Sequence, residues 1–164
     1  MESITRIVGN LQVTLLIEKN TRGDTFMNIA FFLIPKIEVI YFPLNYTMRQ
    51  ALEKMEYHRY TAVPVIDEHG KYAGTLTEGD LLWKMKNTPG LTFAGTARVM
   101  IRDIPQQMTN TPVGIYAEVE DLISLAIVQN FVPVVDDNEV FIGIIRRREI
   151  MEYYAKLAPK KDCE

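Results

Sequence analysis

A threonine and an aspartate, Thr77 and Asp80, stand where an apolar strand-like segment gives way to a helical pattern. The first turn of a helix leaves backbone N–H groups without partners, so a hydroxyl at this point helps to bind an anion such as phosphate. A carboxylate three residues on can accept from both hydroxyls of a ribose. The pair therefore has the chemistry of half a nucleotide site. The same spacing is also close to a capping box, with Thr77 as N-cap and Asp80 at N3, and the two uses are compatible.

Three consecutive arginines, Arg146, Arg147 and Arg148, stand at the start of a second predicted helix. Arginine is a poor N-cap, and three cations oppose the positive end of the helix dipole. A bound anion would remove this conflict, because guanidinium groups bind phosphate bidentately. We therefore expect one or two of the arginines to bind phosphate. The alternative is a solvated basic turn in which Glu149 and Glu152 are the partners.

The other reactive side chains do not form a catalytic set. Residues 74–79 have the glycine spacing of a P-loop, but Asp80 and Leu81 stand where that loop needs Lys and Ser or Thr. His58 lies at a predicted helix end and His69 in a predicted turn, and the single cysteine falls in a charged tail without a positioned base. We expect no enzymatic activity, no metal site and no required cofactor.

Composition indicates an ordinary folded domain. The chain has 164 residues, of which 48% are hydrophobic, and 18 Lys and Arg against 21 Asp and Glu give a net charge of −3. These values exclude general disorder and argue against nucleic acid as a partner. No apolar run reaches the roughly 18 residues of a membrane helix, and the run that ends at Pro35 lacks the flanks of a signal peptide. We expect a cytoplasmic protein with no membrane partner.

An internal repeat relates the two candidate sites. The sequence Val-Pro-Val-x-Asp occurs at 63–67 and again at 132–136, an offset of 69 residues. The same offset aligns Thr77 with Arg146 and Asp80 with Glu149, so residues 63–80 are a degenerate copy of 132–149. Each copy has the pattern of strand, turn, strand and helix.

A further strand and helix precede each copy. They are predicted at 38–42 and 47–56 for the first, and at 112–117 and 119–129 for the second, whose helix is apolar enough to be buried on several faces. Each repeat is thus β-α-β-β-α. The predicted fold is α/β (α+β), with two repeats packed through their sheets about a pseudo-twofold axis. The predicted boundaries are an N-terminal arm (1–34), repeat 1 (35–86), a linker (87–99), repeat 2 (100–157) and a tail (158–164).

The arm has a strand-like segment at 11–17 and a polar turn before Met27. One hypothesis is that Met27 is the natural start and residues 1–26 are an upstream extension. The other is an ordinary extra hairpin.

Over residues 35–157 the chain resembles a tandem pair of cystathionine-β-synthase-type (CBS) domains, a Bateman module of the kind found in small stand-alone bacterial proteins. The resemblance depends on the repeated Val-Pro-Val-x-Asp and on residues 74–80, which fit the family pattern Gly-h-h-Thr-x-x-Asp, where h is apolar. It implies regulation by an adenosyl ligand such as AMP, ATP or cyclic di-AMP, usually in a dimer of modules.

The resemblance also implies that residues just before the Val-Pro-Val strand line the base pocket. Tyr60 would stack on a purine, while the Thr61 hydroxyl and the Ala62 backbone would bond to its edge; the alternative for Tyr60 is a half-buried core aromatic. Some cyclic di-AMP-binding relatives combine Tyr-Thr-Ala with paired arginines, a place that Arg147 and Arg148 occupy here. Ile40 is a candidate apolar wall or a simple core residue. The candidate nucleotide-binding residues are Ile40, Tyr60, Thr61, Ala62, Pro64, Thr77, Asp80, Arg146, Arg147 and Arg148.

The leading functional prediction is a non-catalytic sensor that binds an adenine nucleotide between the repeats and signals to an effector protein. Because the second copy departs from the motif, we expect one site to bind tightly and the other weakly or not at all. The alternative is a dimerising scaffold without a ligand; nucleic-acid binding through the arginines is a weaker third. A homodimer is expected from apolar helix faces around Leu82, Met85, Ile150 and Tyr154.

Overall fold

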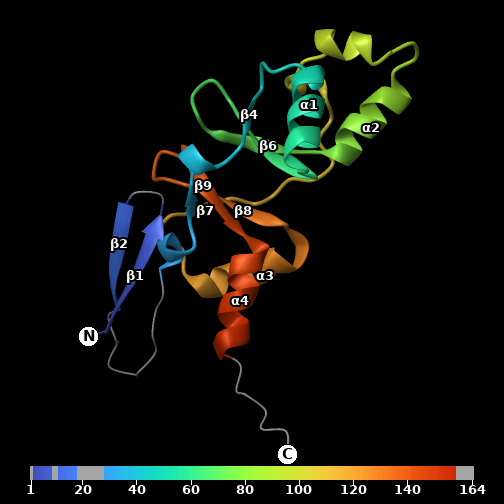
Figure 1. Ribbon diagram of the computed structural model, residues 1–164. Coiled ribbons are helices and arrows are strands. Elements are labelled where there is room, and N and C mark those ends of the chain that lie inside the picture. The colour runs from blue at the N-terminus through green and yellow to red at the C-terminus, as the bar shows by residue number, and fades with distance from the viewer. Residues whose placement is uncertain (1, 9–10, 18–27, 158–164) are drawn as a thin grey trace, which may run out of the picture.

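The computed structural model describes residues 2–8, 11–17 and 28–157. Two units, each a small sheet with helices packed on it, make up the body of the chain (Figure 1). A separate hairpin precedes them, in which β1 (Glu2–Val8) pairs antiparallel with β2 (Leu11–Ile17). The predicted strand at 11–17 is confirmed. Met27 and the tail at 158–164 lie outside the described residues, so the two hypotheses for the arm stay open.

The first unit has a three-stranded sheet in the order β4-β5-β6. Strand β4 is parallel to β5, and β5 is antiparallel to β6. Helix α1 begins after Thr47, whose hydroxyl accepts from the Gln50 backbone N–H in a capping box, and it ends at Arg59 in the left-handed conformation. The elements are β4 (Phe42–Pro43), α1 (Met48–His58), β5 (Ala62–Ile66), β6 (Tyr72–Thr77) and α2 (Glu78–Asn87).

The second unit repeats this plan, as the sequence predicts. Its elements are β7 (Val113–Gly114), α3 (Val119–Val128), β8 (Phe131–Val135), β9 (Phe141–Arg146) and α4 (Arg147–Leu157). The registers match across the 69-residue offset, because Ala62 pairs with Thr77 and Phe131 pairs with Arg146. The hairpin turns also correspond, with positive φ at Gly70 in one repeat and at Glu139 in the other.

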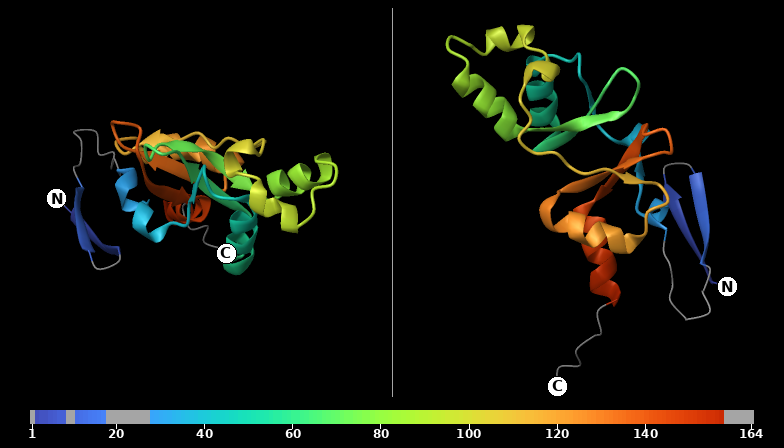
Figure 2. Two further views of the ribbon diagram at one scale, coloured as in Figure 1. Left: turned by 90° about the horizontal axis from the view of Figure 1, so that it is seen from above. Right: turned by 180° about the vertical axis from the view of Figure 1, so that it is seen from behind.

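The sheet of the second unit has a fourth strand, which comes from the start of the chain. Strand β3 (Ile34–Pro35) pairs with β9, giving the order β3-β9-β8-β7. In both views of Figure 2 the light-blue segment that contains β3 lies beside the orange and red second unit. The strand predicted at 38–42 is largely wrong, because a 3₁₀ turn at Lys36–Glu38 follows β3 and pairing resumes at Phe42. This segment crosses from one sheet to the other, so it cannot extend either. Likewise, only Val113–Gly114 of the predicted strand at 112–117 is paired.

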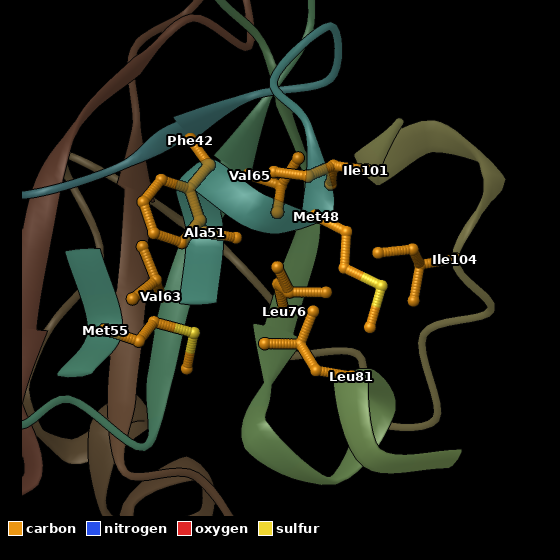
Figure 3. Close-up of a cluster of buried hydrophobic side chains, with 10 residues drawn as sticks. All are labelled: Phe42, Met48, Ala51, Met55, Val63, Val65, Leu76, Leu81, Ile101 and Ile104. Carbon is orange, nitrogen blue, oxygen red and sulfur yellow. The ribbon is translucent and has the colours of Figure 1, made fainter. Parts of the chain in front are cut away.

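Each unit has its own hydrophobic core, and each core includes residues from outside the predicted repeat. The first, drawn in Figure 3, contains Ile101 and Ile104 from beyond the linker together with Met48 and Leu76. The second contains Ile29 and Phe32 from the predicted arm. The segment that enters each repeat therefore completes the core of the other repeat.

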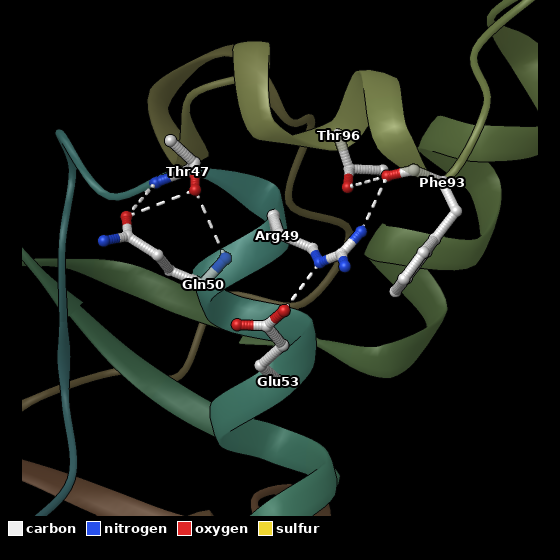
Figure 4. A network of polar contacts seen from close by, with 6 residues as sticks. All are labelled: Thr47, Arg49, Gln50, Glu53, Phe93 and Thr96. Carbon is white, nitrogen blue, oxygen red and sulfur yellow. Dashed lines mark hydrogen bonds and ion pairs between the residues drawn. The ribbon is translucent and has the colours of Figure 1, made fainter.

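The linker follows the surface of helix α1 (Figure 4). The Arg49 guanidinium lies 3.9 Å from the centroid of the Phe93 ring, donates to the Phe93 carbonyl oxygen at 3.3 Å and pairs with Glu53 at 2.6 Å. A cation–π contact and a hydrogen bond thus fix the linker, which forms a 3₁₀ turn at Ala94–Arg98.

The hairpin turns of the two repeats meet at the junction between the units. The Lys71 ammonium lies 2.7 Å from the Glu139 carboxylate, and the Phe141 backbone N–H donates to the Gly70 carbonyl oxygen at 2.9 Å. Lys71 holds the pKa of Glu139 below its ordinary value by a hydrogen bond and by its charge. The ring of Tyr72 stacks on Phe141 across the same junction.

Helix α3 is less buried than its composition predicts. Its inner face packs into the second core, but Ile127 is 74% exposed and Val128 67%. The prediction of burial on several faces is wrong, because within the part of the chain that the structure describes α3 packs mainly against α4 and β8, on its inner face.

The four residues that motivated the expected dimer differ in how exposed they are. Leu82 is exposed, Met85 and Tyr154 pack partly against the cores, and Ile150 is buried in its own core. Exposed apolar side chains on α1 and α2 are Tyr57, Leu82 and Trp83, and those on α3 and α4 are Ile123, Ile127, Val128 and Met151.

Candidate functional site

A cavity of about 430 Å³ lies where the two repeats meet. Its size falls within the range of small-molecule sites. Three stretches form it: the crossing segment after β3, the start of β5 in repeat 1, and the ends of β8 and β9 in repeat 2. The lining residues are Ile34, Glu38, Val39, Ile40, Tyr60, Ala62, Pro64, Asn130, Phe131, Ile144 and Arg146.

Half of the predicted site residues line this cavity, namely Ile40, Tyr60, Ala62, Pro64 and Arg146. They come together because β5 of one repeat and β9 of the other line the same cavity. The other predicted residues, Thr61, Thr77, Asp80, Arg147 and Arg148, are not among the lining residues.

Tyr60 provides an aromatic surface at the cavity. Its side chain is 43% exposed, and its ring stacks on His58 with centroids 5.4 Å apart and an interplanar angle of 14°. The residue does not belong to either core cluster, which disfavours the core-aromatic alternative. Ile40 combines both of its predicted roles, since it lines the cavity and packs partly against the first core.

Thr77 and Asp80 form the capping box that the spacing predicts. The Asp80 side chain is buried, with 2% exposure, and its Oδ2 accepts from the Thr77 backbone N–H at 2.8 Å and from the Thr77 hydroxyl at 2.7 Å. The Gln107 backbone N–H donates to Oδ1 at 2.9 Å. Both carboxylate oxygens are therefore already hydrogen-bonded, and three of the roughly four acceptor positions of the carboxylate are used within the protein.

Each of the three arginines has a partner. Arg146 pairs with Glu149 and Arg148 with Glu152, both at 2.6 Å, and an Arg147 Nη2 donates to the Asn130 side-chain oxygen at 2.7 Å. The glutamate pairs are those of the solvated-turn alternative. A guanidinium has five N–H donors, so each arginine keeps free donors for an anion. Phosphate binding remains a prediction, best placed for Arg146 because it lines the cavity.

Sequence reasoning missed several lining residues, of which Glu38 and Asn130 are polar. Glu38 lies inside a segment predicted as a strand, so its position in the cavity had no sequence signal. Asn130 aligns with Thr61 at the 69-residue offset, and that symmetry would have nominated it. Within 28–157, no group of three or more His, Cys, Asp or Glu side chains is placed to hold a metal ion.

Comparison with known proteins identifies the family. The profile of the CBS domain matches residues 34–87 and again 101–156, so the chain belongs to the CBS domain family as a tandem pair. Proteins of this kind are generally regulatory rather than catalytic. No curated protein matches the chain in sequence.

Solved structures share the fold at low identity. Listeria monocytogenes CbpB in complex with c-di-AMP is 20% identical, with a TM-score of 0.66 over 79% of this chain and 96% of that one. A CBS domain protein from Streptococcus pneumoniae is 23% identical, with a TM-score of 0.69 over 79% and 88%. CBSX2 in complex with AMP is 21% identical, with a TM-score of 0.63 over 80% and 98%. Among the described residues, no helix is long and apolar enough to cross a membrane.

Proposed function

We propose that this protein is a non-catalytic, cytoplasmic sensor of an adenine nucleotide, which it binds in the cavity between its two repeats. The observation that supports this most is the combination of Tyr60 and Arg146 in one cavity: an aromatic surface for a base from one repeat and a guanidinium for a phosphate from the other. Proteins of the same fold have been crystallised with c-di-AMP and with AMP, which supports this ligand class.

This cavity is proposed to be the tight site. A second position at Thr77 and Asp80 would offer a ribose only the remaining acceptor position of a buried carboxylate, so it is proposed to bind more weakly. Thr77 and Asp80 would then belong to the weak site, and the cavity lined by residues of both repeats would be the tight one.

Signalling is proposed to occur through a homodimer and an effector protein. A ligand held by residues of both repeats shifts the equilibrium between two arrangements of the repeats only if it binds one of them better. The exposed apolar side chains of α3 and α4, including Ile127 and Met151, are the surface proposed for these contacts.

The alternative function, a dimerising scaffold without a ligand, has one observation in its favour. The predicted anion-binding arginines and the predicted ribose-binding aspartate are all engaged by protein groups. An adenine nucleotide would have to bind mainly through Tyr60 and the free donors of Arg146.

Isothermal titration calorimetry distinguishes the two functions. AMP, ATP and c-di-AMP are titrated, with GMP and GTP as controls for the base. Tyr60→Ala and Arg146→Ala are compared with Tyr57→Ala, an exposed tyrosine of α1, and Arg102→Ala, an exposed arginine, neither of which lines the cavity. We expect one adenine nucleotide to saturate the wild type and only the cavity variants to lose affinity. Absence of saturable binding of every nucleotide would support the scaffold.

A further inference from the structure

Asn130 is held at the cavity wall by two hydrogen bonds from Arg147. The Arg147 backbone N–H donates to the Asn130 carbonyl oxygen at 3.0 Å, and an Arg147 Nη2 donates to the Asn130 side-chain Oδ1 at 2.7 Å. The first bond fixes the backbone between α3 and β8, and the second fixes the carboxamide. Asn130 lines the cavity, whereas Arg147 does not.

This pair determines which end of the carboxamide is free. A guanidinium offers only donors, so the carboxamide must present its oxygen to Arg147. The Nδ2 group, with two N–H donors, is then left without a partner among the described residues. Without Arg147 the amide could turn over and present either a donor or an acceptor. With Arg147 it presents a donor only.

The equivalent position in the first repeat lacks this arrangement. Thr61 aligns with Asn130 and Glu78 with Arg147 at the 69-residue offset, and the Glu78 backbone N–H donates to the Thr61 carbonyl oxygen at 3.1 Å, as in the second repeat. A glutamate side chain cannot supply the second donor, and Thr61 does not line the cavity. Both repeats therefore make the same backbone hydrogen bond at this position, but only the second repeat adds a side-chain hydrogen bond, from Arg147 to Asn130.

We infer that Asn130 is a ligand-binding residue that donates from Nδ2 to a hydrogen-bond acceptor of the nucleotide, and that Arg147 is a positioning residue that acts through it. The inference rests on the proposed function. It replaces the prediction that Arg147 binds phosphate directly. The acceptor is a ring nitrogen of the base or an oxygen of the phosphate, and the two are distinguished by comparing adenosine with AMP.

The test uses calorimetry with both ligands on matched variants. Asn130→Asp keeps an acceptor for Arg147 but removes the donor, and Asn130→Ala removes both. We expect each to weaken binding roughly tenfold, the loss of one hydrogen bond. Arg147→Ala should weaken it about threefold, because the amide is freed but not removed. Arg102→Ala, an exposed arginine that does not line the cavity, should bind as wild type does.

A double-mutant cycle separates positioning from direct contact. If Arg147 acts through Asn130, Arg147→Ala has no further effect in the Asn130→Ala background. An equal loss in both backgrounds would overturn the inference, as would wild-type affinity of Asn130→Asp. A loss seen with AMP alone locates the acceptor on the phosphate, and a loss seen with adenosine as well locates it on the nucleoside.

A measurement on the wild type tests the contact without any variant that could fail to fold. The side-chain amide ¹H–¹⁵N signals of Asn130 should shift when AMP is added, and unshifted signals at saturation would refute the contact. If the wild type binds no adenine nucleotide at all, the proposed function itself fails. If it binds but Asn130 has no part, only this inference fails.

Discussion

Removal of the Asp80 carboxylate should destabilise the fold substantially. This side chain is 2% exposed and accepts three hydrogen bonds, two from Thr77 and one from the Gln107 backbone N–H. Loss of the Asp80 half of the capping box costs about 1 kcal/mol, and a buried donor left without an acceptor costs about 1–3 kcal/mol. The sum for Asp80→Ala is about 3 kcal/mol, in the upper range for a single substitution. Asp80→Asn keeps the volume and one acceptor oxygen, so about half of that loss is expected.

Urea unfolding at pH 7, followed by circular dichroism, measures both free energies, with Glu78→Ala as a control at an exposed position of the same first turn. The ordering Ala below Asn below wild type is required by the hydrogen bonds. If Asp80→Ala loses less than about 1 kcal/mol, the carboxylate is not the structural link between α2 and the segment at Gln107. Calorimetry on the folded Asn variant then reports separately whether the carboxylate also binds ribose.

Three further outcomes are expected. Lys71 lowers the pKa of Glu139 below its ordinary 4.5, so the stability that this pair contributes is present above that pH and is lost as the pH falls through the lower folded pKa. The difference in unfolding free energy between wild type and Glu139→Gln, measured in urea, should therefore disappear in acid, and a difference that stays constant with pH would contradict this. In Gly143→Ala the new Cβ would collide with the Ile34 carbonyl oxygen of β3, so the free energy of unfolding should fall by about 1–3 kcal/mol and nucleotide binding should weaken. An unchanged unfolding free energy and an unchanged affinity would show that β3 can move freely. Ile127→Glu should dissociate the proposed dimer in sedimentation velocity without lowering the melting temperature; a monomeric wild type would exclude the dimer.

The sequence could predict the strands and helix starts that occur in both repeats. The paired strands β5 and β6 and their copies follow from the apolar patterns, and the capping box follows from the spacing of Thr77 and Asp80. Both are local properties, determined by residues within one turn or one hairpin.

The sequence could not predict contacts that depend on where the chain passes from one unit to the other. The segment at 36–41 has a strand-like composition, yet its course is set by the need to leave one sheet at Pro35 and join the other at Phe42. Glu38 enters the cavity for the same reason. The sequence also could not predict the hydrogen bond between Arg147 and Asn130, because Asn130 lies 17 residues before Arg147. It did predict the glutamate partners of Arg146 and Arg148, which lie three and four residues further along the same helix.

The exchange of core residues has a consequence for how the molecule comes apart. Ile101 and Ile104 complete the first core, and Ile29 and Phe32 complete the second, so a cut in the linker would leave each fragment with a core that lacks two of its buried side chains. Neither half is then an autonomous folding unit, and the two should melt in a single cooperative transition. A ligand that tightens the junction would in that case lengthen the lifetime of the whole chain against proteolysis, so that its concentration could set how much of the protein persists.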